Sequence, residues 1–213
     1  MQHFWLNKQE NNKKLIVFFN GWGMNETPIQ HLKTDDFDIL MLNDYRNFKF
    51  DFSQFNFKKY EKKYLICWSM GVYVVNLFKN YFDNFDKKIA INGTAKMIDD
   101  NYGIPKRIYQ ITIKLFNKDS CDKFIKNMFK DGNINPNIKI TKTLEELKEE
   151  LILIQKIELN EELDFDLAII SDDDKIVPTK NQLNFWKNKA QIININSTHC
   201  PFEKYTSWME LLC

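Results

Sequence analysis

The sequence predicts an α/β protein in which a mostly parallel sheet is flanked by helices. Apolar runs alternate with helical patterns along the chain. The first run, at residues 14–20, places Leu, Ile, Val and two Phe in succession, which is typical of a strand buried on both faces. A chain of 213 residues with 44% apolar residues can form one sizeable core. We therefore expect residues 1–213 to form a single domain.

Five further runs have the same character as the first. Together the six expected strands cover residues 14–20, 37–42, 64–68, 88–92, 165–171 and 190–196. A helix is expected at residues 71–82, because Val72, Val75, Phe78 and Phe82 fall on one helical face. This alternation of strands and helices is the basis of the predicted parallel sheet.

A long segment with few strand signals separates the fourth and fifth expected strands. Thr143 and Glu146 form a capping-box pattern, and apolar residues then recur at three- and four-residue steps as far as Ile157. Residues 105–129 also have a helical pattern. We predict a helical cap at approximately residues 96–160, inserted within the domain after the fourth predicted strand.

Charge and composition exclude several classes of protein. A net charge of +1, from 30 basic and 29 acidic residues, gives no reason to expect a nucleic-acid partner. No run approaches the ~18 apolar residues of a membrane helix, so no membrane association is expected. The four cysteines form no C-x-x-C pair and no secretory segment is recognisable. These features favour a cytoplasmic protein with reduced thiols.

A candidate nucleophile follows the third expected strand, where residues 67–78 read CWSMGVYVVNLF. A strand, then Ser, x, Gly and a helix resemble the G-x-S-x-G turn that exposes a serine at the top of a sheet. The flanking residues must be small because strand and helix nearly touch there, and here they are Cys67 and Gly71. We expect Ser69 to be the nucleophile and Cys67 to be a small buried residue.

A serine nucleophile needs an adjacent base, and the chain has only three histidines. His3 precedes the first expected strand, and His31 lies in the segment after the first Gly-rich loop. His199 follows the last expected strand, within NSTHCPF. That is where a hydrolase with a doubly wound sheet presents its histidine, so we expect His199 to be the base.

The orienting acid should follow a strand that lies between the serine and the histidine in the chain. Residues 171–178, SDDDKIVP, supply Asp172, Asp173 and Asp174. The order serine, aspartate, histidine is that of an α/β-hydrolase. Asp174 matches a D-x-x-V-P pattern found in this loop of α/β-hydrolases and is our choice for the acid. Asp173 is the alternative.

Glycine usage points to an oxyanion hole. Of only six glycines, Gly21 and Gly23 flank Trp22 directly after the first expected strand. Ester hydrolysis develops a negative oxygen that backbone N–H groups stabilise. The two glycines would let the loop turn tightly and present the N–H of Trp22. The second donor would be the N–H of Met70, the residue after the nucleophile.

Four segments together resemble the BioG-type pimeloyl-acyl carrier protein methyl ester esterases of biotin synthesis. They are FFNGWGM, CWSMG, SDDDKIVP and THCPF, and the resemblance covers nearly the whole chain. It implies an α/β-hydrolase that removes the methyl ester from pimeloyl attached to acyl carrier protein. It also implies that Ser69 is the nucleophile, His199 the base and an aspartate in the Asp174 loop the third member. Trp22 and Met70 would be the oxyanion donors.

The resemblance further implies that acyl carrier protein is a partner, docked on the cap while the cap holds the pimeloyl chain. We expect Trp22, Trp68 and Arg107 to contact the substrate. Related esterases often use several arginines in the cap, whereas this cap has chiefly Lys with Arg107 alone. No metal or cofactor is expected, because the three histidines are scattered and form no cluster.

The first part of the cap carries an excess of basic residues. Between residues 96 and 131, eight basic side chains against five acidic ones leave a local balance of +3. The eight are Lys96, Lys106, Arg107, Lys114, Lys118, Lys123, Lys126 and Lys130. We expect this half of the cap to attract an acidic carrier protein.

Two other functions compete with the pimeloyl esterase. One is a general carboxylesterase or thioesterase that acts on small acyl substrates. The other is a non-catalytic binding protein with a hydrolase fold, against which the intact set of serine, aspartate and histidine argues.

Overall fold

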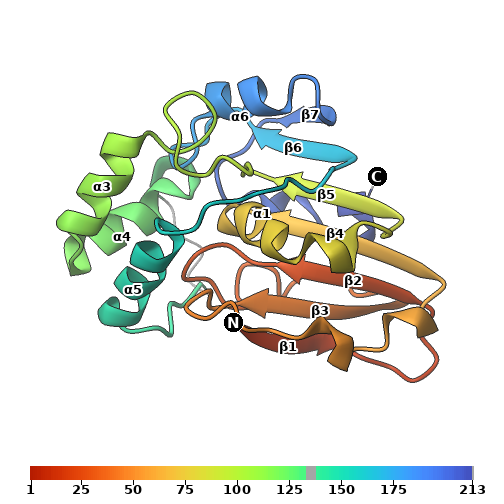
Figure 1. Cartoon of the computed structure of the whole chain (residues 1–213). Helices are drawn as coiled ribbons and strands as arrows, with labels where there is room; N and C mark the ends of the chain where they lie inside the picture. Colours follow the sequence, from red (N-terminus) through yellow and green to blue (C-terminus); the bar gives the residue numbers. More distant parts are fainter. Residues whose placement is uncertain (133–137, 213) are drawn as a thin grey trace.

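The computed structural model describes residues 1–132 and 138–212, and a seven-stranded sheet forms its centre. The strands lie in the order β1-β3-β2-β4-β5-β6-β7. All neighbouring pairs are parallel except β1 with β3, which is antiparallel. This topology confirms the predicted class, a mostly parallel sheet flanked by helices (Figure 1).

All six predicted strands are present, with ends that differ by one or two residues from those expected. They are β2 (Lys14–Phe19), β3 (Phe37–Asn43), β4 (Lys62–Trp68), β5 (Lys87–Ile91), β6 (Leu167–Ser171) and β7 (Gln191–Ile195). The apolar runs of the inner strands made them recognisable because a parallel strand inside such a sheet is buried on both faces. In β3, for example, every residue is buried. The edge strand β7 is instead half-buried or exposed along its length.

The edge strand β1 (Gln2–Asn7) was not predicted from the sequence. The first three residues of β1 are exposed and the last three half-buried, so it has no apolar run. Its antiparallel pairing with β3, from Gln2 opposite Asn43 to Asn7 opposite Ile39, includes an irregularity between Trp5 and Asn7. An edge strand gains its stability from this pairing, which cannot be read from a local hydrophobic pattern.

The helix expected at residues 71–82 is divided into three. The parts are α1 (Met70–Val74), the 3-10 helix η3 (Val75–Phe78) and α2 (Lys79–Phe82). Asn76 explains the irregularity, because its side-chain amide donates to the carbonyls of Val72 (2.7 Å) and Tyr73 (3.1 Å). Its Oδ1 atom accepts from the N–H of Leu163 (2.7 Å), so the same side chain also anchors the segment that leads to β6.

Three helices lie between β5 and β6 in the chain: α3 (Lys106–Lys114), α4 (Lys118–Asn127) and α5 (Leu144–Ile154). In Figure 1 they form a group beyond the ends toward which the arrows of the parallel strands point. The helical pattern at residues 105–129 therefore contains two helices. The break occurs at Asn117, which caps α4 by accepting from Ser120 N–H (2.9 Å).

Helix α5 begins at the predicted capping box, where Thr143 and Glu146 exchange side-chain and backbone hydrogen bonds. It ends at Ile154, before the last residue of the apolar pattern, Ile157. The Tyr73 hydroxyl donates to the carbonyl of Ile157 (2.7 Å), so the chain after α5 is held against α1 instead of continuing as a helix. A tertiary contact has overridden the local periodicity there.

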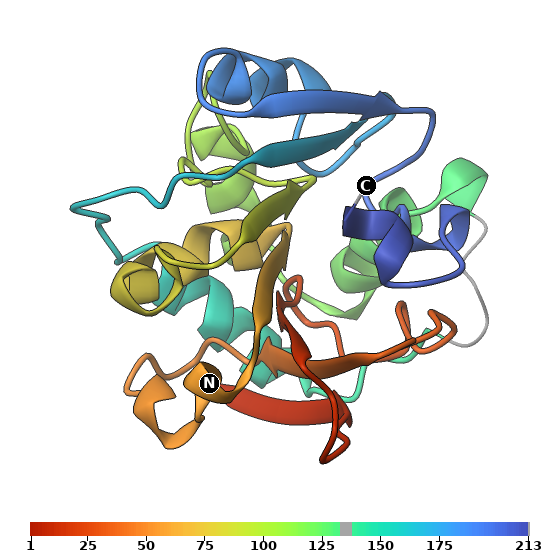
Figure 2. The ribbon, with the colours of Figure 1, turned by 90° about the vertical axis from the view of Figure 1, so that its right-hand side faces the viewer.

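The sheet separates two apolar clusters. Figure 2 shows α1 and α2 on one side of the sheet and the C-terminal segment on the other. On the first side, α6 (Thr179–Trp186) contributes Phe185 and Trp186 to the same cluster as Phe78 and Phe82. On the second side, Phe202 and Trp208 pack beside Phe18. Both faces are thus covered, as a parallel sheet requires.

Short 3-10 helices complete the described chain. They are η1 (Phe52–Gln54), η2 (Phe57–Lys59), η4 (Lys130–Gly132), η5 (Phe202–Lys204) and η6 (Met209–Leu212). Within residues 1–132 and 138–212, no helix has the length and apolar character needed to span a bilayer. Of the four cysteines, Cys67, Cys121 and Cys200 are buried free thiols, and Cys213 lies outside the described residues.

Candidate active site

Ser69 occupies a sharp turn between the end of β4 and the start of α1. Its backbone has φ +55° and ψ −120°, a conformation that non-glycine residues rarely adopt. The Ser69 N–H donates to the Ile91 carbonyl (2.9 Å), and the Ser69 carbonyl accepts from the Val72 N–H (3.0 Å). A Cβ atom on Gly71 would lie 2.3 Å from the carbonyl oxygen of Phe19, so only glycine fits there. This is the strained turn that the strand-Ser-x-Gly-helix pattern predicts.

A chain of hydrogen bonds joins Ser69, His199 and Asp174. The Nε2 atom of His199 is 2.8 Å from Ser69 Oγ, and its Nδ1 atom is 2.8 Å from Asp174 Oδ2. His199 is 1% exposed, and the Asp174 side chain is fully buried. A carboxylate beside Nδ1 favours the tautomer with its proton on Nδ1. Nε2 is then free to accept the proton of the Ser69 hydroxyl.

Asp174 is held in place by the loop and helix that follow it. Its Oδ1 atom accepts from the N–H groups of Ile176 and Val177, both at 2.9 Å. Its Oδ2 atom accepts from Gln182 Nε2 of α6 at 2.8 Å. Hydrogen bonds to both oxygens stabilise the charged carboxylate and fix its plane toward His199.

The two neighbouring aspartates have different surroundings. Asp172 and Asp173 are exposed, and no hydrogen bond joins either one to His199 among the described residues. Asp172 Oδ1 accepts from the N–H of Ser197 (3.1 Å), and Asp173 pairs with Lys175 (3.4 Å). The structure therefore brings Asp174, the residue of the D-x-x-V-P pattern, to the histidine.

Trp22 and Met70 line the same small cavity as the Ser69 side chain. Neither backbone N–H donates a hydrogen bond to any described residue, so both can serve a ligand. Gly23 has φ +71°, which allows the turn after Trp22, whereas Gly21 is needed for space. A Cβ atom on Gly21 would lie 3.0 Å from the Trp68 ring.

The cavity at Ser69 adjoins a larger apolar groove. The cavity itself measures about 30 Å³, and the groove between α3 and α4 about 340 Å³. Five residues line both spaces: Trp22, Ile104, Phe124, Leu151 and Ile176. A ligand in the groove would therefore contact apolar side chains that also line the cavity at Ser69.

Comparison with known proteins agrees with this geometry. The model of the family described as "Pimeloyl-ACP methyl esterase BioG" matches residues 1–211. The chain belongs to the BioG family. A crystal structure of BioG from Haemophilus influenzae has a TM-score of 0.84 and 25% identity, and the alignment covers 99% of each chain. An esterase from Exiguobacterium antarcticum shares the fold with a TM-score of 0.68 at 15% identity, over 93% of this chain and 87% of that one.

A curated relative of the BioG family member described here is named "Malonyl-[acyl-carrier protein] O-methyltransferase" and comes from Bacteroides fragilis (strain 638R). It is 36% identical over 182 residues, which is 82% of this chain. This chain spans only 37% of the length of that relative. The BioG structure and the esterase share the α/β-hydrolase fold with this chain, which confirms the predicted fold class.

The structure corrects the expected role of Trp68. Its side chain is fully buried and does not line the cavity at Ser69, so it is not available to contact a substrate. Instead, Trp68 Nε1 donates to the carbonyl of His199 (2.8 Å), and its ring packs edge-on against Phe202. In this member of the BioG family Trp68 supports the histidine loop from below.

Arg107 lies on the exposed side of α3 and does not line the Ser69 cavity or the apolar groove. Arg107 could therefore contact only a part of the substrate that lies on the outer surface of the cap. Trp22 differs from Arg107, because it lines both the cavity and the groove.

Asn92, directly after β5, supports the site but was not predicted from the sequence. It has φ +47°, and its side-chain amide donates to the carbonyls of Thr198 and His199, both at 3.0 Å. It also donates to Ser171 Oγ (2.8 Å) at the end of β6. A polar residue directly after a buried strand was a usable signal, since the carboxyl ends of the parallel strands surround the site.

A second missed group fixes the Trp22 loop from behind. The Tyr45 hydroxyl donates to the Asn20 carbonyl (2.7 Å), and the Tyr45 N–H donates to Glu150 Oε1 of α5 (2.7 Å). Burial raises the pKa of Tyr45, which keeps its hydroxyl protonated as a donor. Trp22 Nε1 donates to the Leu147 carbonyl (3.0 Å) of the same helix. Helix α5 therefore holds this loop directly at Trp22 and indirectly through Tyr45.

Neither a cysteine nucleophile at Cys67 nor a metal site has support among the described residues. Burial raises the pKa of the Cys67 thiol, which favours the neutral thiol over the nucleophilic thiolate. No group of three or more His, Cys, Asp and Glu side chains in the described ranges is arranged to hold a metal ion.

Proposed function

We propose that this chain is a serine esterase that hydrolyses the methyl ester of pimeloyl-acyl carrier protein. Its products would be methanol and pimeloyl-acyl carrier protein for biotin synthesis. The observation that carries the proposal is the hydrogen-bonded series Ser69, His199 and Asp174, at 2.8 Å for each link, in a chain of the BioG family. These three residues act as a catalytic triad in a cytoplasmic enzyme.

In the first step Ser69 Oγ attacks the ester carbonyl carbon, and its proton passes to His199 Nε2. Asp174 holds the imidazole and stabilises the positive charge that it gains. The N–H groups of Trp22 and Met70 receive the negative oxygen of the tetrahedral intermediate. When this intermediate collapses, the bond to the methoxy oxygen breaks and His199 returns the proton, so methanol leaves.

In the second step a water molecule attacks the carbonyl carbon of the acyl-enzyme. His199 Nε2 takes one proton from this water and passes it to Ser69 Oγ as the acyl-serine bond breaks. The product is a carboxylic acid, which loses its remaining proton to solvent and leaves as the carboxylate. Each turnover therefore consumes one water and restores the resting protonation of Ser69 and His199.

The apolar groove is the proposed site of the acyl chain. Its outer wall on α3 includes Ile108, Ile111 and Leu115, which are 53%, 42% and 60% exposed. Their spacing along the helix places them on one side of α3. Exposed apolar side chains that continue into a cavity at a nucleophile suit a seven-carbon chain that enters from the surface. The carrier protein would then dock on the basic surface around the groove entrance, of which Lys123 forms part.

The decisive assay compares pimeloyl-acyl carrier protein methyl ester with free pimelate methyl ester, following methanol release by the purified protein. Ser69→Ala and His199→Ala should each lower turnover by several orders of magnitude, with losses of about 10⁶-fold known for such units. More than a tenth of the wild-type activity in either folded variant would refute the assignment.

A fluorophosphonate probe provides an independent test of the nucleophile. It should label wild-type protein and not Ser69→Ala, because an activated serine is needed for the reaction. Labelling without preference for the carrier-bound ester would indicate a general carboxylesterase or thioesterase. Absence of labelling in folded wild-type protein would indicate a non-catalytic binding protein.

A further inference from the structure

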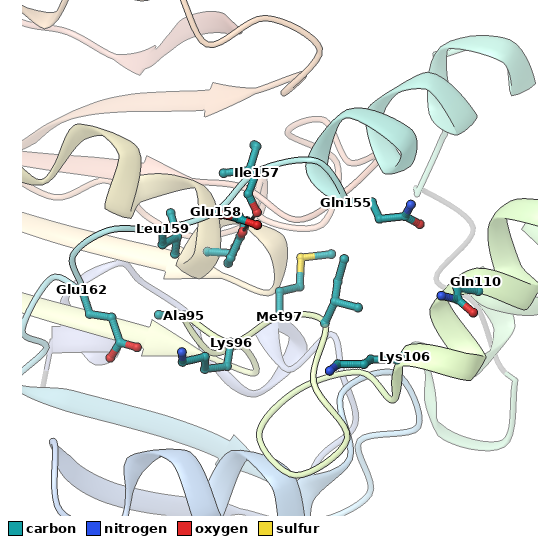
Figure 3. Close-up of a pocket in the computed structure, with 12 residues that line it drawn as sticks. Ala95, Lys96, Met97, Lys106, Gln110, Gln155, Ile157, Glu158, Leu159 and Glu162 are labelled. Atoms are coloured by element: carbon teal, nitrogen blue, oxygen red, sulfur yellow. Dashed lines mark hydrogen bonds between the residues drawn. The ribbon is translucent and has the colours of Figure 1, made fainter.

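A second and larger pocket lies behind the cavity at Ser69. It measures about 530 Å³ and lies between the loop after β5, the start of α3 and the segment that follows α5. Figure 3 shows Met97 in the middle of this pocket, with Lys106 on one side and Ile157 and Glu158 on the other. Met97 also lines the cavity at Ser69, and it is the one residue that both linings share. The Met97 side chain is therefore the wall between the two spaces.

The backbone at Met97 is firmly held, although its side chain is intrinsically flexible. The Met97 carbonyl accepts from the Ile104 N–H (2.7 Å), and Ile98 pairs with Ile104 in an isolated bridge. A Cβ atom on Gly103 would lie 2.0 Å from the Lys96 carbonyl oxygen, so the two arms of this loop, which contain Lys96 and Gly103, are in close contact. Met97 itself is 6% exposed. The loop therefore fixes where Met97 lies, and the separation of the two cavities depends on its one side chain.

The size of the Ser69 cavity limits what can occupy it beside the reacting carbon. A water-sized group needs about 10–15 Å³ by this kind of measure. The observed volume of about 30 Å³ is less than a tenth of that of either neighbouring space, so the Ser69 cavity favours a small alcohol group. A methoxy group has two non-hydrogen atoms and suits it better than a butoxy group, which has five.

The two ends of an ester must occupy different spaces. The apolar groove shares five lining residues with the Ser69 cavity and is the proposed site of the acyl chain. The alcohol end is then confined to the remainder of the cavity, which Met97 closes on the side of the 530 Å³ pocket. We infer that Met97 determines specificity for the alcohol of the ester and restricts this enzyme to methyl esters. The inference rests on the proposed esterase function.

The test is an alcohol series on a fixed acyl group. Methyl, ethyl and n-butyl hexanoate are hydrolysed by wild-type protein and by Met97→Ala, and kcat/KM is measured for each. A single extra methylene in a closed pocket costs about tenfold or more. We expect the methyl-to-butyl ratio of kcat/KM to fall at least about tenfold in Met97→Ala, because the butyl group can then extend into the 530 Å³ pocket.

Three further variants make the result specific. Met97→Val shortens the side chain less and should give a methyl-to-butyl ratio between those of the wild type and Met97→Ala. It replaces Met97→Ala in the test if that variant does not fold. Met97→Leu keeps the volume of the wall and should keep the wild-type ratio. Leu159→Ala enlarges the 530 Å³ pocket without touching the Ser69 cavity, so it should also keep the wild-type ratio. Thermal unfolding of each variant verifies that it is folded.

An acyl series on a fixed alcohol separates this inference from its alternatives. Methyl butyrate, hexanoate and octanoate should be ranked in the same order by wild-type protein and Met97→Ala. A changed acyl ranking with an unchanged alcohol ranking would overturn the inference, because Met97 would then face the acyl chain. An unchanged alcohol ratio in folded Met97→Ala would also overturn it while leaving the esterase function intact. Hydrolysis of no ester by folded wild-type protein would overturn both.

Discussion

At the scale of single residues, the acid of the site is distinguished from its neighbours by its surroundings. Three aspartates follow β6, and only Asp174 is buried and within hydrogen-bonding distance of His199. Two backbone N–H groups and one side-chain amide donate to it. Asp172 and Asp173 remain exposed. The difference arises because the chain turns after Asp173 and directs the next side chain inward.

We therefore expect Asp174→Asn to lower kcat by about 10⁴-fold, since an amide favours the wrong tautomer of the imidazole. Asp172→Asn and Asp173→Asn are the matched controls and should keep activity close to that of the wild type. The measurement is steady-state hydrolysis of the carrier-bound methyl ester. A larger defect in Asp173→Asn than in Asp174→Asn would transfer the role to residue 173.

At the scale of elements, a group of charges attaches α5 to the end of β3. Arg46 donates to both oxygens of Asp44 at 2.7 Å, and it also lies 3.0 Å from Glu146 of α5. Lys142 lies 2.9 Å from Glu150. Burial raises the pKa of Glu150, and the charge and hydrogen bond of Lys142 partly offset that rise. Helix α5 also accepts the Trp22 hydrogen bond, so these ion pairs help to position a proposed oxyanion donor.

The pair of Asp44 and Arg46 predicts a pH-dependent stability. The Arg46 hydrogen bonds lower the pKa of Asp44 from 3.8 to about 2. A lowered carboxyl pKa stabilises the fold above pH 3.8, and the contribution is lost as the pH falls from there toward 2. Asp44→Asn should therefore cost about 1–2 kcal/mol of unfolding free energy near neutral pH. Asparagine suits this test because the residue has φ +57°, which asparagine tolerates.

Urea unfolding of wild-type protein and Asp44→Asn at pH 7, 4 and 2.5 measures this effect. The difference between the two proteins should shrink as the pH decreases. Asp173→Asn, which alters an exposed aspartate, should show little difference from wild type at any of these pH values. A difference for Asp44→Asn that stayed constant from pH 7 to 2.5 would show that its charge is not responsible.

At the scale of the whole molecule, charge is distributed unevenly about the site. The helices α3 and α4 carry exposed basic residues beside the groove, including Lys106, Arg107, Lys114 and Lys123. Among described side chains, none of these four is paired with a carboxylate. Lys118 differs, because it pairs with Asp122 at 2.7 Å. A basic surface around the entrance would speed encounter with an acidic carrier protein and orient it.

Reversing this charge should affect the carrier-bound substrate alone. We expect the triple variant Lys106→Glu, Arg107→Glu and Lys114→Glu to lower kcat/KM on pimeloyl-acyl carrier protein methyl ester, with little change on a small free ester. Each exposed contact is worth only ~0.2–1 kcal/mol, so the three together should cost about 3- to 100-fold. The remaining activity should also depend less on salt.

A control with the same change in net charge reverses lysines at the opposite end of the sheet. Lys13, Lys58 and Lys187 are exposed and precede the amino ends of β2, β4 and β7. Their reversal should leave both substrates nearly unaffected. Equal losses on both substrates in the cap variant, or equal losses in both triple variants, would show that the cap charge is not a docking surface.

The sequence alone predicted the class of fold, the serine and the histidine of the proposed triad, and Asp174 as its acid with Asp173 as the alternative. The carboxyl ends of parallel strands meet at one edge of the sheet. Ser69, Asp174 and His199 each follow a predicted strand, so their convergence could be predicted without knowing any distance. The edge strand β1 and the helix breaks at Asn76 and Asn117 could not be predicted from the sequence. They depend on the pairing of β1 with β3 and on side-chain hydrogen bonds.

Which side chains line the cavity beside the proposed triad depends on the tertiary structure. Trp68 directly precedes the proposed nucleophile, yet the alternation of a strand turns it under the histidine loop. Met97 has no sequence signal, and its importance arises because one loop places it between two cavities. Tyr45 and Glu150 are 105 residues apart and become partners when α5 packs against the end of β3. The order of the strands brings the proposed triad residues to one edge of the sheet. The shape of the cavities beside Ser69 depends instead on packing between segments that are distant in the chain.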